Sequence, residues 1–393
     1  MLAKTKYSDS ISLGVYSFAH FTMDFSCAFL LFRLVRINAI PASSVVFTFL
    51  LYNCLAFGLE FLIGLFFNPR TARFSAFCGE ILLAIGLLLG ITIVNAFHCS
   101  GGAFGSSPIV SFFSSTKNGS CGGFPMVACV LVGVGNACFH VGGGIDTLTR
   151  NRGKNWRSGV FISTGALGLA LGIRFGDNPE LGVTFVHLLV LTTVVATALW
   201  FICKRTDFDL EPCDENNRQV AFSENALDKY SFWRLIAVLF VVFSRSVVSF
   251  AAPEIGNVRN LAEFPGISLA VAAFLGKFLG GFGSDFSNAR FCSVLAAIAA
   301  IPCLCLVSNP ILFWAGVLLL NSTTAITLTS AARLCGNLVG FAFGLTTLAL
   351  LGGYFVYDWM AWLIEHHDCL ASINAALIAL MILSGIALAF SIK

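Results

Sequence analysis

The chain has 393 residues, of which 57% are hydrophobic and 11% charged, and its formal net charge is +3. A soluble globular chain has roughly 45–50% apolar and about 25% charged residues, so this composition excludes a soluble enzyme and a disordered chain. The small net charge excludes a nucleic-acid partner, because such a partner requires a basic face. The mean hydropathy of +0.87 instead predicts an all-α protein that crosses a plasma or inner cell membrane several times, with the lipid bilayer as its surroundings.

Twelve apolar runs are long enough to cross a membrane. A spanning helix needs about 20 mostly apolar residues, and helices are expected because lipid cannot satisfy bare backbone N–H and C=O groups. The runs cover 11–33, 44–67, 74–98, 125–147, 158–176, 181–203, 235–252, 264–283, 291–308, 311–331, 337–358 and 370–391.

The distribution of Lys and Arg predicts the orientation. Such residues concentrate in cytoplasmic loops, and most of the 23 fall in loops on the side of the N-terminus. Both termini are therefore expected in the cytoplasm, with the first run kept as a helix rather than removed as a signal peptide. The polar stretch 204–234 is expected to be a cytoplasmic connector between an N-terminal six-helix bundle, 1–203, and a C-terminal one, 235–393. A regulatory role for the connector is the alternative.

Cysteine usage indicates no metal or cofactor site. The 14 Cys residues lie mostly in apolar runs, where a thiol behaves as a small hydrophobic group, and no C-x-x-C pair occurs. The Gly- and Ser-rich segment 99–124, which is expected to be external, contains Cys99, Cys121 and Asn118. The sequence leaves undecided whether the two cysteines form a disulfide and whether Asn118 carries a glycan.

The chain contains an internal repeat. The segment 64–74 joins the second and third runs, and at a constant offset the segment 281–291 joins the eighth and ninth. Two matching six-helix halves are typical of secondary transporters with a site near the membrane midplane. The fifth and eleventh runs also share a glycine spacing that lets helix backbones approach closely; its members are Gly165, Gly168, Gly172, Gly336, Gly340 and Gly344.

At the second copy of this repeat the chain resembles the major facilitator superfamily. Gly281, Asp285 and Arg290 form the pattern G-x-x-x-D-x-x-x-x-R, which is similar to the hallmark cytoplasmic motif of that superfamily. The first copy departs from it, with Asn68 at the acidic position. The resemblance implies two six-helix bundles and alternating access.

Within the superfamily, the chain looks most similar to the fosmidomycin resistance protein family. The resemblance rests on the H-x-x-x-D pair His20 and Asp24, the block Leu131 to His140 followed by Arg150, Phe161 with the fifth-run glycines, Phe243-Ser244-Arg245, and Gly340 to Gly344. The Pro-Glu that follows the histidine in that family is Val141-Gly142 here, and the fifth run lacks the proline associated with drug antiporters. The resemblance implies a proton-coupled carrier of small organic molecules, with export as the expected direction.

Ionisable residues inside the apolar runs are the candidate site. Each costs about 2.5–3.5 kcal/mol to insert and usually faces a cavity or a partner. His20, His140, Arg245 and Asn321 lie at similar depths in the first, fourth, seventh and tenth runs, which line the central cavity in the superfamily that the chain resembles. We expect one cavity, with Asn136, His140, Arg245 and Asn321 binding substrate. Arg245 would attract an anionic group, and His20 with Asp24 would relay protons.

Other interpretations stand beside these. Either histidine could simply donate a hydrogen bond between helices. Glu60 and Glu80 could form a further proton-coupling site, or pair with Arg70 and Arg73, and pairing is slightly favoured. Lys277 is expected to extend toward the cytoplasm rather than to contact substrate.

Gly281, Asp285, Arg290 and Arg333 are expected to form a cytoplasmic gate. Asp285 would engage a neighbouring helix end or a basic residue such as Arg333, and so hold the outward-facing state without touching substrate.

The sequence therefore predicts a monomeric secondary active transporter, not an enzyme. It would move a small organic anion or zwitterion, using the proton gradient and no cofactor, with efflux expected. Proton-coupled uptake of a metabolite and a transporter-like receptor or scaffold are the alternatives. No P-loop for an ATP-driven pump and no H-E-x-x-H metal motif occurs.

Overall fold

The structure is a computed structural model that describes residues 2–67, 69, 71–100, 123–150, 154–204, 229–258, 266–306, 309–336, 338–366 and 370–392. Within these ranges every regular element is helical, which confirms the predicted all-α class. Asn118 and Cys121 lie outside the described residues, so the glycan and the disulfide remain predictions.

The helices before the connector follow the first six predicted runs. They are α1 (Leu2–Arg36), α2 (Val45–Gly58), α3 (Glu60–Phe66), α4 (Ala72–Ser100), α6 (Gly123–Arg150), α7 (Asn155–Asp177) and α8 (Phe185–Lys204), with the short 3-10 helices η1 (Ala42–Ser44) and η2 (Pro179–Leu181).

The helices after the connector follow the last six runs. They are α9 (Lys229–Val258), α10 (Gly266–Phe286), α11 (Ala289–Ile301), α12 (Pro310–Ser322), α13 (Thr324–Leu334), α14 (Val339–His366) and α15 (Leu370–Ser391), with the π-helical segment η4 (Pro302–Leu306). Residues 229–234, predicted as the end of the connector, are instead the first turns of α9. Arg234 is buried there and donates to the backbone oxygen of Ser391, 2.6 Å away.

Eleven helical spans in the described residues are long and apolar enough to cross a membrane, so the protein is a multi-pass membrane protein. The ninth predicted run, 291–308, corresponds to a shorter apolar helix, Ala289–Cys305. Pro302, which has no backbone N–H to donate, marks its change from α-helix to π-helix. The twelfth crossing and the cytoplasmic position of the termini stay predictions.

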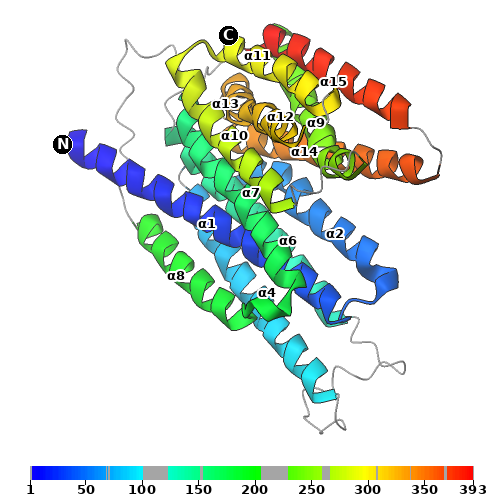
Figure 1. Ribbon diagram of the computed structural model, residues 1–393. Coiled ribbons are helices and arrows are strands. Elements are labelled where there is room, and N and C mark those ends of the chain that lie inside the picture. The colour runs from blue at the N-terminus through cyan, green and yellow to red at the C-terminus, as the bar shows by residue number, and fades with distance from the viewer. Residues whose placement is uncertain are drawn as a thin grey trace.

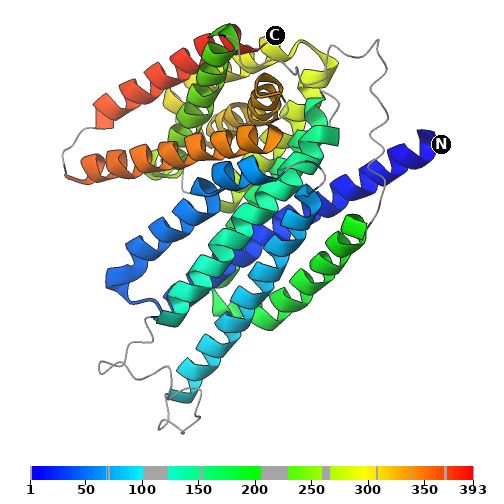
Figure 2. The same cartoon turned by 180° about the vertical axis from the view of Figure 1, so that it is seen from behind.

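The helices form two groups that follow the order of the chain. Figure 1 shows α1 to α8 in the lower part of the molecule and α9 to α15 in the upper part, and the view from behind shows the same division (Figure 2). Contacts within the first group are dominated by α1 with α7 and α4 with α6, and contacts between the groups by α7 with α10 and α3 with α14.

Glycines set the close approach of α7 to α1, as their spacing predicts. A Cβ atom at Gly168 or Gly172 would overlap the backbone oxygen of Phe21 or Phe25. The matching spacing in the eleventh run is only partly helical, because Gly336 lies in the turn before α14 with a φ of +59°.

Glycine pairs also close the two seams between the groups. Gly64 of α3 lies against Gly340 of α14, and Gly281 of α10 lies against Gly159 of α7. Gly64 and Gly281 are equivalent positions of the repeat, so the two copies make equivalent contacts. All four glycines lie near the helix ends predicted to be cytoplasmic, and the two groups therefore meet closely at that end.

Candidate functional site

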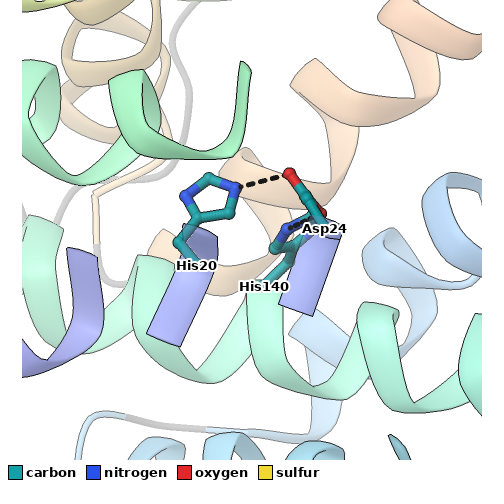
Figure 3. Close-up of side chains that lie close together, drawn as sticks. All are labelled: His20, Asp24 and His140. Atoms are coloured by element: carbon teal, nitrogen blue, oxygen red, sulfur yellow. Dashed lines mark ion pairs between the residues drawn. The ribbon is translucent and has the colours of Figure 1, made fainter. Parts of the chain in front are cut away.

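The structure brings four of the predicted residues into one buried cluster, His20, Asp24, His140 and Glu60. Nε2 of His20 lies 3.3 Å from Oδ2 of Asp24, and Nε2 of His140 lies 3.3 Å from Oδ1 of the same carboxylate. Figure 3 shows both imidazoles directed at Asp24. Nδ1 of His140 lies 3.0 Å from Oε1 of Glu60, which is fully buried. We call these four residues the His–Asp cluster.

Helix geometry explains the convergence. His20 and Asp24 are four residues apart on α1, so they share a face, and His140 meets them from α6. The imidazole centroids of His20 and His140 are 4.6 Å apart in an edge-to-face arrangement. Gly165 of α7 makes room, because a Cβ atom there would overlap both Nε2 of His20 and Oδ2 of Asp24.

Asn136 also joins the cluster. It lies one turn before His140 on α6, and its Nδ2 donates to Oδ1 of Asp24 over 3.1 Å. Its Oδ1 is buried without a hydrogen-bond partner in the described structure. The predicted face of α6 carrying both residues is therefore the face turned to Asp24.

When both carboxylates of the cluster are ionised, its two imidazoles carry too few hydrogens for their polar contacts unless positive charge is added. Nδ1 of His20 lies 2.8 Å from the backbone oxygen of Phe161, which only accepts, so this nitrogen carries the hydrogen. The remaining three contacts of the two imidazoles are all to carboxylate oxygens. Two neutral imidazoles supply two hydrogens for these four contacts, and two ionised carboxylates supply none. Two contacts would then join acceptor to acceptor.

Positive charge at two of these contacts removes the conflict. Two further protons would give two imidazolium ions facing two carboxylates, with a net charge of zero. Burial strongly favours such compensation, because unpaired buried charges are costly. With both carboxylates ionised, the contacts of the cluster are therefore satisfied only when two positive charges are added.

The other two predicted substrate residues lie in the second group of helices, apart from the cluster. Arg245 of α9 is buried and donates from Nη1 to Oγ1 of Thr327, at 3.1 Å, and of Thr323, at 3.4 Å. Nδ2 of Asn321 donates to the backbone oxygen of Val317 in its own helix, 2.9 Å away. Among the described residues, no ion pair or hydrogen bond joins Arg245 or Asn321 to the cluster.

A pocket lies beside Arg245. Its polar lining comes from Arg245, Ser244, Thr323 and Ser384, and its apolar lining from side chains of α9, α11, α12 and α15. No residue of the His–Asp cluster lines it. The six predicted residues thus lie in two separate places, one on each group of helices, rather than around one shared pocket. We call these two places the half-sites of the predicted site, and the roles of their residues stay predictions.

Lys277 of α10 connects the half-sites electrostatically. It is only partly exposed and lies close enough to both Asp24 and Arg245 to interact with their charges. The expectation that Lys277 extends toward the cytoplasm came from its spacing from Asp285 and stays a prediction. The backbone of Lys277 lies against Gly159 of α7.

The two buried acids on α3 and α4 differ from the predicted pairing. Glu60 contacts His140, and Arg73 instead contacts Asp146 over 3.2 Å and the backbone oxygen of Ile202 over 3.0 Å. Glu80 is fully buried, and neither of its carboxylate oxygens has a hydrogen-bond partner in the described structure. Arg70 lies outside the described residues. Pairing of the two acids with Arg73 is therefore wrong, and a proton-coupling role of Glu80 stays a prediction.

The sequence analysis did not identify Asp146, whose carboxylate pairs with Arg73 over 3.2 Å and with Arg150 over 3.1 Å. Its four-residue spacing from Arg150 was a signal that could have found it.

Two of the predicted gate residues, Gly281 and Asp285, lie on α10 at its seam with α7, whereas Arg290 is on α11 and Arg333 on α13. Oδ1 and Oδ2 of Asp285 accept from the backbone N–H groups of Asn155 and Trp156, each over 2.8 Å, at the start of α7. A carboxylate at this helix end is favoured by the helix dipole. Arg333 is close enough to interact with the Asp285 charge, whereas Arg290 is exposed. Asp285 thus engages the neighbouring helix end, the first of the two predicted partners.

The amino-acid sequence matches no protein-family profile and no curated protein. Its fold is nevertheless similar to solved transporters of the major facilitator superfamily. FucP in the outward conformation matches with a TM-score of 0.65 at 11% identity, over 98% of this chain and 97% of that one. A variant of the E. coli fucose:proton symporter FucP matches with a TM-score of 0.61 at 12% identity, over 98% and 97%.

A bacterial homologue of the iron transporter ferroportin, in an outward-facing state, matches with a TM-score of 0.62 at 12% identity, over 96% of this chain and 98% of that one. The resemblance to the fosmidomycin resistance family is not supported by these comparisons and stays a prediction. At such low identity the likeness concerns the fold alone. The chain is a multi-pass membrane protein with the major facilitator fold.

Proposed function

We propose that the protein is a secondary active transporter that moves a small organic anion or zwitterion by proton-coupled alternating access. The carrying observation is the placement of the His–Asp cluster on one group of helices and, on the other, of Arg245 and Lys277, neither of which forms an ion pair with a carboxylate among the described residues. A single chain contains both half-sites, so we propose a monomer as the functional unit.

Arg245 and Lys277 support an anionic substrate. Neither makes an ion pair with a carboxylate in the part of the chain that the structure describes, and Arg245 bonds to neutral threonine hydroxyls instead. An unpaired charge in a low-dielectric interior is costly. A bound carboxylate or phosphonate would supply the missing counter-charge, and the planar guanidinium can bind it with two parallel hydrogen bonds.

The His–Asp cluster supports coupling to protons. Its contacts are complete when two positive charges are added, and it interacts with the C-terminal half-site through Lys277. In the proposed cycle, a substrate anion near Lys277 and Arg245 competes with Asp24 for the lysine charge. Binding of anion and loading of the cluster then influence each other, which is the requirement for coupling.

The seams support alternating access. The two groups meet at Gly64–Gly340 and Gly159–Gly281, and Asp285 adds its two hydrogen bonds to α7 at the same end. Separation of these contacts would open the predicted cytoplasmic side. Efflux is the proposed direction, on the resemblance stated for the sequence. Uptake is the second candidate, because the fold is similar to that of a fucose:proton symporter.

The test is transport in vesicles. Anions that raise the melting temperature of the purified protein would first be selected, since a ligand that binds the folded state stabilises it. Their flux would then be measured in proteoliposomes with an imposed proton gradient of either direction. We expect flux that depends on the gradient and reverses with it. Binding without any gradient-dependent flux would instead support a receptor or scaffold.

A further inference from the structure

We propose that Nε2 of His20, Nε2 of His140 and the carboxylate of Asp24 form a binding site for a divalent first-row transition-metal ion, with Zn²⁺ as the probe. The inference uses the cluster of the proposed function but does not require transport. It concerns an ion that nothing in the sequence pattern predicted.

The donor atoms have the right spacing. Zinc takes nitrogen and oxygen ligands at about 2.0–2.2 Å in tetrahedral sites, which places neighbouring ligand atoms roughly 3.3–3.5 Å apart. The two nitrogen–oxygen distances to Asp24 are both 3.3 Å. All three donor groups lie within 4.8 Å of one another, so small side-chain rotations would bring them around one ion.

The outer contacts of both imidazoles match those of metal ligands. A histidine that binds a metal almost always donates its other ring N–H to a carbonyl or carboxylate oxygen, which fixes the ring and its tautomer. Nδ1 of His20 faces the Phe161 carbonyl at 2.8 Å, and Nδ1 of His140 faces the Glu60 carboxylate at 3.0 Å. Both contacts leave the Nε2 lone pair directed inward, toward Asp24 and the neighbouring imidazole.

Charge supports the same assignment. One divalent ion supplies the two positive charges that the cluster lacks, with both imidazoles neutral and both carboxylates ionised. It also gives a ligand bond to Nε2 of His140, which is buried and lies 3.3 Å from Oδ1 of Asp24 without a hydrogen bond in the described structure.

The donor set selects the class of ion. Two imidazoles and one carboxylate suit Zn²⁺, Fe²⁺ or Co²⁺, whereas Ca²⁺ and Mg²⁺ prefer oxygen ligands alone. Three protein ligands leave a fourth position for water or an anion, and the buried Oδ1 of Asn136 lies beside the site without a partner. The Asp24 side chain is 18% exposed, more than those of His20 and His140 at 9% and 7%.

Titration calorimetry with Zn²⁺ and absorption spectroscopy with Co²⁺ would test the site. The full chain would be purified in detergent with a histidine-free affinity tag and stripped with a chelator. We expect one strong site per chain, visible Co²⁺ bands of a four- or five-coordinate nitrogen–oxygen site, and no competition by Mg²⁺. Asp24→Asn and His140→Gln should abolish both signals. Glu60→Gln, which alters the outer contact of His140 and leaves the three donor groups in place, should weaken binding by about 10- to 100-fold.

His187→Ala is the matched control, since His187 is exposed on α8 and contacts Thr184. Binding should be unchanged in this variant. Melting curves without metal would confirm that each variant is folded. Absence of strong binding, or binding that survives in folded Asp24→Asn and His140→Gln proteins, would overturn the proposal. Because no transport is measured, these results are independent of the proposed function, and gradient-driven flux in chelator-treated vesicles would support proton coupling without the metal.

Discussion

The two half-sites bury charge in opposite ways. In the His–Asp cluster, each imidazole contacts a carboxylate, and Asp24 bridges both rings at 3.3 Å. In the other half-site, the Arg245 guanidinium bonds to the hydroxyl groups of Thr323 and Thr327. One half-site thus sets carboxylates beside its titratable groups, whereas in the other the guanidinium has no carboxylate partner among the described residues.

In the proposed function, this difference gives the two groups of helices separate tasks. A half-site that is complete when it holds cationic charge is suited to the coupling ion. A half-site with an excess of positive charge is suited to an anion. Lys277, which interacts with Asp24 and Arg245, lies where each can respond to the other. Removing the charge of Asp24 or of Arg245, and measuring whether gradient-driven flux or anion binding is lost, tests this assignment.

Replacement of Asp24 should have the largest effect. Asp24→Asn removes the carboxylate that faces both imidazoles, so the cluster can no longer balance two positive charges. We expect gradient-driven flux to fall to the level of protein-free vesicles, while anion binding in detergent persists. Intact gradient-driven flux in Asp24→Asn and in His20→Ala would show that the relay assignment is wrong.

Replacement of Arg245 should mainly reduce the binding of anions. A hydrogen bond to a charged group contributes about 1.5–3 kcal/mol, so Arg245→Ala should weaken anion binding by about 10- to 100-fold. Neutral compounds should be affected much less. Arg174→Ala is the control, since Arg174 is an exposed residue near the end of α7. Equal losses for anions and neutral compounds would remove the argument for an acidic substrate.

Much of the first half-site could be predicted from the sequence. The four-residue spacings on α1 and α6, together with the depth of each residue, were enough to bring His20, Asp24, Asn136 and His140 together. These predictions succeed because helix geometry fixes faces and depths from residue numbers alone. Glu60 was placed near the right depth, but the choice between His140 and an arginine depends on how α3 is rotated against α6.

The rest required the packing of helices that are distant in the sequence. The closeness of Lys277 to Asp24 follows from how α10 lies on the first group of helices, and the partner of Arg73 follows from how α4 lies on α6. Neither appears in the periodicity of a single helix.

The fold was easier to predict than the site, because hydropathy alone locates the spans. The π-helical segment at Pro302 in the ninth run could not be predicted from mean hydropathy.

Gly165 tests whether the exact spacing of the cluster matters. Gly165→Ala places a Cβ atom where Nε2 of His20 and Oδ2 of Asp24 now lie. Overpacking of a buried contact costs typically about 1–3 kcal/mol, and we expect a corresponding loss in thermal stability together with impaired transport. Gly14→Ala is the matched control, since a Cβ atom there meets nothing within 4 Å. Equal stability of the two variants would mean that α1 and α7 do not hold the cluster at this spacing.

Replacement of Asp285, a residue of the predicted cytoplasmic gate, should have the smallest effect on transport. The two repeat copies share their glycine contacts but differ at the arginine, because Arg73 is buried with Asp146, whereas its equivalent Arg290 is exposed. In the second copy, Asp285 crosses to α7 in the first group. Asp285→Asn turns one acceptor into a donor that faces a backbone N–H. The loss of one hydrogen bond, about 1 kcal/mol, would weaken the closed seam about fivefold.

Transport by Asp285→Asn should therefore fall, while substrate affinity in detergent stays close to that of the unmodified protein, because Asp285 contacts neither half-site. Asp358→Asn, an exposed acid on α14, is the control and should change neither quantity. A parallel loss of affinity and flux in Asp285→Asn would place Asp285 in substrate binding and remove its role as a gate. If only flux falls, the seam between α7 and α10 is an element that opens and closes while both half-sites stay intact.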